Sequence, residues 1–378
     1  MKVLLVKLSS MGDLIHALPA LTDAMNNIPG ITFDWVVEKS FSDIPYWHPA
    51  VKRIIETDHR NWRKNIKETI QHGKLIKSIR EIRREKYDVV IDGQSNFKSA
   101  FFTFLARGTR CGPDKHSSCE PFTGYAYQRK FKIDKSEHAI KRMRLLFAHA
   151  LGYAYHDTPP DSAISHQRLV KPKIEVPYQK FFFFIHNASW HSKLWPETYW
   201  QKLIKLTTNA GYNILLPSGN AAEFERSQKL AQDNAQVMAL PIMTLTEIAY
   251  IISKAKLVVC TDTGLSHLSS ALNISSITLY GSTDPKLIGA IGQNNIQLQA
   301  NFPCSPCYNK SCKFKGASVY KPACYMSIPP ERVWREITKL LAKTIVVPKP
   351  VAHEPVEGSR VVPELACPEL VEGSKGRI

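Results

Sequence analysis

The sequence lacks several features that would assign it to a common class of protein. No apolar run approaches the roughly 20 residues that a membrane-spanning helix needs. Lys7 and two serines interrupt the first apolar run, so we expect no secretory signal. The chain contains no G-x-G-x-x-G, no G-x-x-x-x-G-K-[ST] and no G-x-S-x-G. These absences argue against a nicotinamide dehydrogenase, a P-loop nucleotidase and a common serine hydrolase.

Acidic residues are few relative to basic ones. The 378 residues include 33 Asp and Glu against 50 Lys and Arg, a formal net charge of +17. Such a charge favours an anionic partner: a nucleic acid, an acidic membrane surface or a phosphorylated substrate. Aromatic residues are sparse in the basic stretch 52–86, with Trp62 as an exception. This disfavours stacking on single-stranded nucleic acid, so we expect no nucleic-acid partner.

The length predicts two domains, and the hydrophobic content of 44% is sufficient for buried cores. Short apolar runs alternate with segments of helical periodicity over residues 1–160 and again over 175–328. A polar, proline-containing segment, 155–173, separates the two series. The alternation predicts two doubly wound α/β domains that face a cleft. An amphipathic helix is expected at 329–345, and the Pro- and Glu-rich residues 346–378 are expected to be a disordered tail without a catalytic role.

Within these series the patterns predict individual elements. The expected strands are 3–6, 31–37, 52–56, 87–92, 181–186, 213–217, 257–260 and 275–280. The expected helices include a long basic one at 61–86, one from residue 97, and those at 137–151, 196–209, 221–234, 244–253, 264–272 and 330–344.

The first strand leads into a turn that carries a carboxylate. Gly12 permits a tight turn after Ser9 and Ser10, and Asp13 lies in that turn. Side chains at the carboxyl end of a parallel strand face the ligand crevice of such a fold. Asp is also a frequent helix cap, worth about 1 kcal/mol. From the residues alone, both a catalytic carboxylate and a cap remain open.

The run VVCTDTGLSH, residues 258–267, predicts an anion site. An apolar strand stops at Asp262 and Thr263, and a helix starts at Gly264. Free N–H groups and the helix dipole at such a terminus bind phosphate. The Thr263 hydroxyl adds a donor, Gly264 allows close approach, and His267 could face the same anion. Simple helix capping by Asp262 or Thr263 is compatible with this interpretation.

Further candidates follow other strands. Ser189 and Lys193 come after the FFFFI strand, where both could contact a phosphate, and a lysine there is unfavourable for the helix dipole. Glu223 could bind ribose hydroxyls, although a solvated glutamate is the commoner case. Basic residues that fit an anionic sugar or phosphate acceptor are Arg60, Arg63, Lys64 and Lys98.

Four cysteines form the pattern C-x2-C-x4-C-x11-C: Cys304, Cys307, Cys312 and Cys324. Zinc sites favour two close pairs, and only the first pair has that spacing. A loop of reduced thiols is the favoured interpretation, and a structural metal or an occasional disulfide stays open.

Together these motifs resemble the bacterial lipopolysaccharide heptosyltransferases of glycosyltransferase family 9, and the type I enzymes most of all. The resemblance is carried by KLSSMGDLIHALPALTDA, IPGITFDWVVE, Lys193 with Trp195-Pro196, and DTGLSHLSSAL followed by ITLYGSTDPKLIG. It covers about residues 1–345. It implies a GT-B fold, in which a Rossmann-like first domain binds the acceptor and a second one binds ADP-heptose, with the last helix packed back across the first domain.

The resemblance also implies an activity: inverting transfer of L-glycero-D-manno-heptose from ADP-heptose to Kdo of Kdo2-lipid A. No metal or other cofactor is required. The enzyme would work as a monomer in the cytoplasm, at the inner membrane's cytoplasmic face.

Roles for individual residues follow from the same resemblance. Asp13 matches the general base, and Lys193 would neutralise the departing ADP phosphates, which Thr263 and Gly264 hold. The remaining donor residues would be Ser189 near the phosphates, Glu223 on the ribose, Met243 against the adenine, and Asp262 on the heptose hydroxyls, with His267 nearby. The acceptor half would contain Ser10, Gly12, Arg60, Arg63, Lys64 and Lys98.

Two departures bear on the acceptor. Cys119 stands before Glu120-Pro121, where the type I enzymes often have an arginine, and the cysteine loop 304–324 resembles the type II enzymes. The alternatives are therefore transfer of a second heptose by a type II enzyme, a GT-B nucleotide-sugar epimerase, and a non-catalytic basic protein that binds nucleic acid.

Overall fold

The computed structural model describes residues 1–64 and 73–345 and contains two six-stranded parallel sheets. The first sheet has the order β3-β2-β1-β4-β5-β6. Its strands are β1 (Lys2–Val6), β2 (Thr32–Glu38), β3 (Val51–Thr57), β4 (Lys86–Asp92), β5 (Arg107–Pro113) and β6 (Arg129–Phe131). This is the strand order of a doubly wound dinucleotide-binding fold.

The second sheet repeats that topology in the order β12-β11-β10-β7-β8-β9. Its strands are β7 (Phe181–Ile185), β8 (Asn213–Leu216), β9 (Val237–Ala239), β10 (Leu257–Thr261), β11 (Ser276–Tyr280) and β12 (Asn295–Gln299). Counted from β7, the strands again run 3-2-1-4-5-6 across the sheet. The predicted pair of doubly wound α/β sheets is confirmed.

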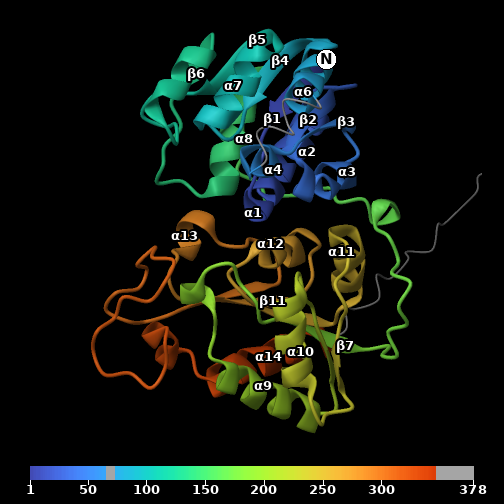
Figure 1. The fold of residues 1–378 in the computed structure, drawn as a ribbon, viewed down its shortest axis with the longest axis vertical. Coiled ribbons are helices and arrows are strands. Elements are labelled where there is room, and N and C mark those ends of the chain that lie inside the picture. The colour runs from blue at the N-terminus through green and yellow to red at the C-terminus, as the bar shows by residue number, and fades with distance from the viewer. Residues whose placement is uncertain (65–72, 346–378) are drawn as a thin grey trace, which may run out of the picture.

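Helices join the strands on both faces of each sheet (Figure 1). In the first half they are α1 (Met11–Ile15), α2 (Leu18–Asn27), α3 (Asp43–Trp47), α4 (His59–Lys64), α6 (Lys74–Arg83), α7 (Phe97–Leu105) and α8 (Ala139–Leu151). In the second they are α9 (Glu197–Asn209), α10 (Ala221–Ala231), α11 (Leu245–Lys254), α12 (Gly264–Ala271), α13 (Pro285–Ile288) and α14 (Pro330–Ile345). Short 3-10 turns are η1 (Lys39–Phe41), η2 (Pro121–Ala126), η3 (His166–Arg168), η4 (His191–Lys193) and η5 (Ala323–Ser327).

The central strands are buried on both faces, as parallel strands between two helical layers must be. All five residues of β7 and all five of β10 are buried. Elsewhere in the second half, helices α10 and α11 begin at side-chain caps, such as the capping box of Thr244 and Glu247 on α11. The local sequence signals therefore agree with the tertiary fold.

The last helix does not pack where the resemblance implies. Val333, Ile337 and Leu340 on α14 belong to the apolar core under the second sheet, and the helix packs against α9 and β11. The expectation that this helix packs back across the first domain is therefore wrong for its described contacts. The apolar face of α14 is covered by the second domain, which α14 follows directly in sequence.

Other differences concern the edges of the sheets and two segments outside the described residues. The patterns did not predict β5, β6, β9 or β12, because these strands are short or rich in polar residues. The expected helix at 61–86 is described only as α4 and α6, and the expected disordered tail, 346–378, lies outside the described residues. Within 1–64 and 73–345, no helix has the length and apolar content to cross a membrane.

The two halves share a contact at the carboxyl ends of their central strands. Helix α1, after β1, packs on α12, after β10, and α3 packs on α11 (Figure 1). One buried apolar cluster includes Leu14 from the first half and Leu268 from the second. The indole N–H of Trp47 donates to the Thr246 hydroxyl across the same boundary, at 3.3 Å.

Candidate active site

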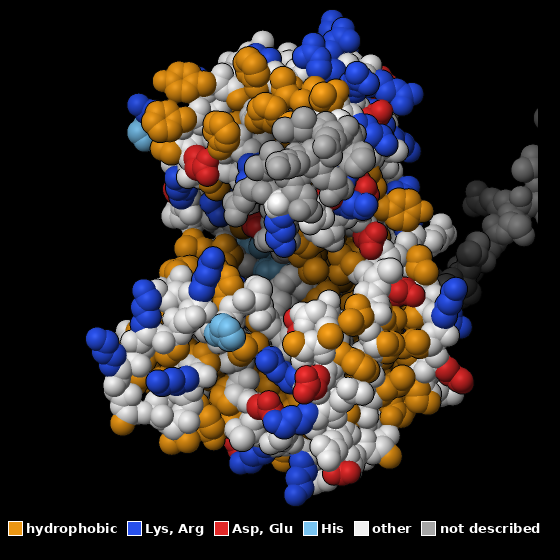
Figure 2. All heavy atoms as spheres, viewed as in Figure 1, with side chains coloured by type: hydrophobic (Ala, Val, Ile, Leu, Met, Phe, Trp, Pro, Cys, Tyr) orange, Lys and Arg blue, Asp and Glu red, His pale blue; other side chains and the backbone are white. Residues whose placement is uncertain are grey.

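One predicted site residue from each half, Asp13 and Thr263, lies where α1 contacts α12. Asp13 lies on α1, which follows β1, and Thr263 lies at the start of α12, which follows β10. Lys193 ends η4, after β7. Figure 2 shows a hollow between the two halves, with histidine side chains at its base. The ligand crevice of each doubly wound sheet therefore opens toward the other.

Two glycines make this contact close. A Cβ on Gly264 would lie 2.3 Å from Sδ of Met11, and a Cβ on Gly12 would lie 2.6 Å from Cδ2 of His267. No real Cβ tolerates such distances, so a larger residue at either position would push the helices apart. The sequence analysis assigned Gly12 to a tight turn and Gly264 to the close approach of an anion. The structure shows that both also permit the two halves to touch.

The Asp13 carboxylate is both a helix cap and a charged group at this boundary. Its Oδ2 accepts hydrogen bonds from the Ser10 backbone N–H at 3.0 Å and from the Ser10 hydroxyl at 2.6 Å. Crowding by protein atoms tends to raise the pKa of Asp13, but the Lys7 charge and the Ser10 bonds outweigh it and hold the pKa below its usual value. The residue keeps exposed surface, so solvent or a ligand can reach it.

Lys7 is a site residue that the sequence reasoning missed. Its side chain is buried, and Nζ donates to the Gly93 carbonyl at 2.8 Å. Burial lowers the pKa of Lys7, and the charges of Asp13 and Asp92 oppose that shift. A lysine directly after a buried strand was the available signal, because an unpaired charge there would be costly.

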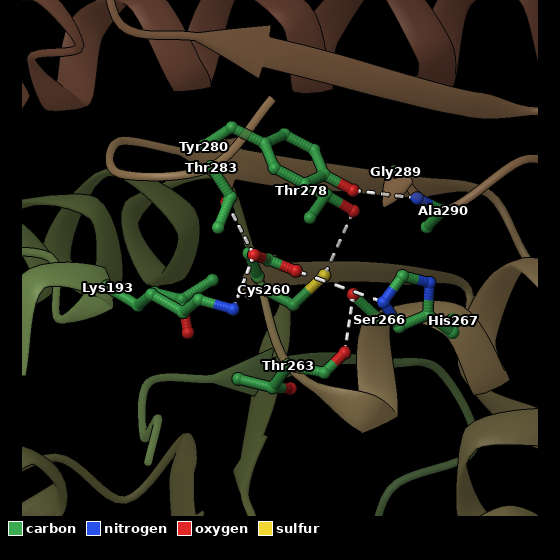
Figure 3. A network of polar contacts seen from close by, with 12 residues as sticks. Lys193, Cys260, Thr263, Ser266, His267, Thr278, Tyr280, Thr283, Gly289 and Ala290 are labelled. Atoms are coloured by element: carbon green, nitrogen blue, oxygen red, sulfur yellow. Dashed lines mark hydrogen bonds and ion pairs between the residues drawn. The ribbon is translucent and has the colours of Figure 1, made fainter. Parts of the chain in front are cut away.

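Asp262 joins a polar network in the second half, and Figure 3 shows its partners Lys193, Thr283 and His267 around one centre. Its Oδ2 accepts from Lys193 Nζ at 2.6 Å and from the Thr283 hydroxyl at 2.6 Å. Its Oδ1 lies 3.8 Å from Nε2 of His267. The Asp262 residue is 3% exposed, so this is a buried ion pair rather than a surface one. The predicted Lys193 and Asp262 are thus brought into direct contact.

Thr263 has unused hydrogen-bonding capacity. Its Oγ1 is buried and has no hydrogen-bond partner among the described residues, and its side chain makes no cap bond to α12. The backbone of α12 begins at Gly264, where the first N–H groups of a helix lack internal acceptors. Beside the Lys193 ammonium, these donors form a set suited to a phosphate.

His267 contacts the first half of the molecule, and its expected anion contact stays a prediction. Its Nδ1 lies 2.9 Å from Nε2 of His16 on α1, and the rings meet edge to face at 4.4 Å between centroids. Burial lowers the pKa of His267, although Asp262 and Asp13 act in the opposite direction. A third ring, His138, contacts the Gly289 carbonyl through Nε2 at 2.9 Å. These histidines join the two halves across the contact.

The other predicted donor residues also lie on the second half. Ser189 is exposed, and Met243 is half-buried against the core. The Glu223 carboxylate accepts the Gly219 N–H at 2.8 Å at the start of α10. Glu223 is therefore at least a turn-stabilising residue, and its ribose contact stays a prediction.

The predicted acceptor residues lie on the first half. Lys64 at the end of α4 and Lys98 on α7 are exposed. Arg60 and Arg63 belong to α4, and their side chains are outside the described set. Cys119, in the position of a family arginine, is exposed, and its backbone N–H donates to Ser95 Oγ at 3.1 Å.

The cysteine loop supports the second half of the site. The Ser305 hydroxyl donates to the Gly281 carbonyl at 2.6 Å, and the Ser192 N–H, next to Lys193, donates to the Lys310 carbonyl at 3.1 Å. Its four cysteines are free thiols. No group of three or more potential metal ligands is found in residues 1–64 and 73–345, so the metal interpretation has no support from the geometry.

The arrangement combines a carboxylate from one half with an anion-binding donor set from the other. Such a pair suits a group transfer, because a base can take a proton from a nucleophile while a departing phosphate is held. Asp13 is the carboxylate on the first half, and Lys193, Thr263 and the start of α12 are the donors on the second.

Comparison with known proteins agrees with this architecture. The sequence profile of glycosyltransferase family 9 (heptosyltransferase) matches residues 75–318. Lipopolysaccharide heptosyltransferase 1 of Pseudomonas aeruginosa is 38% identical over 90% of this chain and 98% of its own length. The Escherichia coli K12 protein of that name is 45% identical over 79% of this chain and 94% of its own.

Solved structures of the Escherichia coli heptosyltransferase WaaC have the same fold. The structure with ADP aligns with a TM-score of 0.79 at 40% identity and covers 90% of this chain and 100% of the other. The structure with ADP-2-deoxy-2-fluoro heptose aligns with a TM-score of 0.76 at 38% identity, over 90% and 99% of the two chains.

Proposed function

The chain belongs to glycosyltransferase family 9, the heptosyltransferases, and we propose that it is a type I enzyme of lipopolysaccharide inner-core synthesis. It would transfer L-glycero-D-manno-heptose from ADP-heptose to a Kdo sugar of Kdo2-lipid A, with inversion of the anomeric carbon. The donor is supported by the WaaC structures, which contain ADP and an ADP-heptose analogue. The type I assignment is supported by type 1 relatives that this chain matches over nearly their whole length.

One observation carries the mechanism: the packing of α1 on α12 brings the Asp13 turn to the Thr263 turn. In the proposed reaction, Asp13 takes the proton of the acceptor hydroxyl as its oxygen attacks the anomeric carbon. The bond from that carbon to the diphosphate oxygen breaks, and ADP leaves with the electron pair. Inversion requires attack from the face opposite the leaving group, which suits a base and a phosphate site on opposite halves.

Asp13 is suited to this role by its environment. The Lys7 charge and the Ser10 hydrogen bonds hold its pKa below the usual value, so the carboxylate is ionised throughout the neutral range. The same Ser10 bonds orient it, because two donors converge on Oδ2 and leave Oδ1 for the acceptor. A positioned base of this kind contributes roughly 10²- to 10⁴-fold in rate.

Stabilisation of the leaving diphosphate is assigned to the second half. Lys193 uses one of its three donors on Asp262 and keeps the others for phosphate oxygens. The partnerless Thr263 hydroxyl and the first N–H groups of α12 would add neutral donors. We propose that this donor set acts in place of a metal ion.

Recognition of the substrates extends outward from these groups. Ser189 would lie near the phosphates, Glu223 on the ribose and Met243 against the adenine, while Asp262 would contact heptose hydroxyls. The acceptor would be gripped by Ser10, Gly12, Arg60, Arg63, Lys64 and Lys98 on the first half. The enzyme would act as a monomer at the cytoplasmic face of the inner membrane, where a lipid acceptor is held.

A type II activity is the second candidate, because the cysteine loop that packs beside Lys193 resembles that class. Measuring ADP release from ADP-heptose tests both. We expect ADP release in the presence of Kdo2-lipid A. We expect no release when that acceptor already carries one heptose. Preference for the heptosylated acceptor would indicate type II. Turnover of a free UDP-sugar without an acceptor would indicate an epimerase and overturn the proposal.

A further inference from the structure

Helix α7 exposes a row of aromatic side chains to solvent. Phe97, Phe101 and Phe104 are 75%, 40% and 58% exposed and recur at positions i, i+4 and i+7, which is one face of a helix. The opposite face of α7 is buried against the first sheet through Phe102 and Thr103. None of the three outward residues belongs to a buried core cluster, although the Phe101 ring meets the buried Phe102 ring edge to face.

The neighbouring turn η2 extends this row. Phe122 and Tyr125 are 77% and 84% exposed, and η2 packs directly against α7. We define these five residues as the aromatic face: Phe97, Phe101, Phe104, Phe122 and Tyr125. At roughly 150–250 Å² per aromatic side chain, the face exposes on the order of 600 Å². Monomeric soluble proteins rarely expose contiguous apolar patches of this size without a partner.

The aromatic face is rigidly supported from below. The buried Asp92 carboxylate accepts hydrogen bonds from the Ser99 hydroxyl on α7 at 2.9 Å and from the Tyr127 hydroxyl at 2.7 Å. Asp92 thus ties α7 to the segment that follows η2. The exposed rings are held on a preorganised platform, which differs from a row of loosely placed surface residues.

Basic side chains border the aromatic face. Lys98 and Lys130 are exposed, and the Arg110 guanidinium lies 5.3 Å from the centroid of the Phe104 ring. The Glu120 carboxylate, at the start of α7, accepts the Phe97 backbone N–H at 2.7 Å. Figure 2 shows hydrophobic side chains gathered on the upper part of the molecule, with lysine and arginine side chains around them.

We propose that the aromatic face is a docking surface for an anionic lipid bilayer. Aromatic rings partition into the headgroup region of a bilayer, and neighbouring lysines and arginines are attracted to anionic lipids. Stable peripheral binding generally needs two such signals together, and both are present here. The net charge of +17 complements an acidic leaflet and opposes a second copy of the same chain.

The location of the aromatic face gives this docking a consequence. Helix α7 starts just after β4, which pairs with β1, and β1 leads into the turn that carries Asp13. A bilayer against the aromatic face would therefore adjoin the half of the site that we assign to the acceptor. The docking itself does not depend on the proposed chemistry and can be measured without any substrate.

Vesicle binding tests the proposal. The full chain would be mixed with phosphatidylethanolamine–phosphatidylglycerol vesicles, and the bound fraction measured by flotation. Replacing Phe97, Phe104 and Phe122 by Ser should weaken binding at least tenfold, because three largely exposed rings are lost. The matched control replaces Val170 and Val319 by Ser. These residues are 52% and 86% exposed outside the aromatic face, and binding should be unchanged.

Two further measurements decide between alternatives. Replacing Arg110 and Lys130 by Glu should weaken binding to anionic vesicles and leave the weaker binding to phosphatidylcholine vesicles unchanged. Sedimentation should give the same mass for the native chain and the triple Phe variant. A native dimer that becomes a monomer in that variant, or equal vesicle binding by both, would overturn the proposal.

An activity comparison separates this inference from the proposed function. With an acceptor embedded in vesicles, the triple Phe variant should release ADP more slowly than the native chain. With a delipidated, water-soluble Kdo acceptor the two should be equal. Absence of ADP release from both proteins would contradict the proposed function and leave the vesicle-binding result to stand alone.

Discussion

Replacing Asp13 by Asn separates the two roles that this carboxylate has in the structure. Asparagine keeps an oxygen that can accept the Ser10 N–H and hydroxyl, now at 3.0 and 2.6 Å, but it cannot take a proton. The cap should therefore survive while the base is lost. A change in rate without a change in stability is expected.

The magnitudes of the two effects differ widely. A general base contributes roughly 10²- to 10⁴-fold in rate, about 3–5 kcal/mol of the activation barrier. Loss of a helix cap costs only about 1 kcal/mol even when the side chain is removed completely. The Asp13→Asn protein should thus unfold within about 1 kcal/mol of the native protein. Asp13→Ala should lose both the cap and the activity.

The assay is acceptor-dependent ADP release, with ADP affinity measured separately by calorimetry. ADP affinity should change less than about twofold, because the phosphate donors lie on the second half of the molecule. A matched control is Glu247→Gln on α11. Its carboxylate accepts the Thr244 N–H at 2.9 Å and hydroxyl at 2.7 Å in the same kind of capping box. That variant should retain native activity.

The outcome that would refute this reasoning is native kcat in a folded Asp13→Asn protein. A pH profile adds a second check. The pKa of Asp13 lies below its usual value, so kcat/KM should show no loss attributable to this carboxylate between pH 5 and pH 7. Replacing Lys7 by Met removes the charge that lowers this pKa, and the acid limb should then move to higher pH.

Other predictions concern the phosphate site, the contact between the halves and acid stability. Lys193→Ala removes the partner of Asp262 and should weaken ADP binding, by calorimetry, at least tenfold; unchanged affinity would remove Lys193 from the site. Gly264→Ala puts a Cβ 2.3 Å from the Met11 sulfur and should lower both stability, by about 1–3 kcal/mol, and activity. Thermal melting and ADP release measure the two effects. The control Gly124→Ala, whose Cβ would lie 3.9 Å from its nearest neighbour, should change neither. Burial lowers the pKa of His186 to about 4, so the native state binds fewer protons than the unfolded chain. Urea titrations should accordingly show stability that is fully present above about pH 6.5 and falls by roughly 3 kcal/mol as the pH drops toward 4, and less so in His186→Gln.

The fold was predictable from local patterns wherever those patterns were strong. The buried strands β1, β4, β7 and β10 are short apolar runs followed by turn residues, and each was predicted within a residue or two. Strong local signals of this kind survive in the tertiary structure because burial on both faces requires them. The edge strands β6 and β9, of three residues each, carry no such signal.

The candidate site was predictable as a list of residues at strand ends, because topology brings the carboxyl ends of parallel strands together. Its connections were not. The pairing of Lys193 with Asp262 and of His16 with His267 joins residues that are 69 and 251 positions apart. No local period encodes contacts over such separations. Lys7 lies close to Asp13 in sequence and was missed because it was read only as an interruption of the first apolar run.

The sequence by itself determined the two α/β halves, the turn chemistry of Asp13 and Thr263, and the resemblance to heptosyltransferases. Only the tertiary structure decided how the halves meet, where α14 packs, and that the aromatic face of α7 and η2 stays uncovered. The physical reason is that periodicity and capping act within a few residues. Packing depends on which surfaces the folded chain brings together, and a glycine such as Gly264 acquires its second role only when Met11 lies against it.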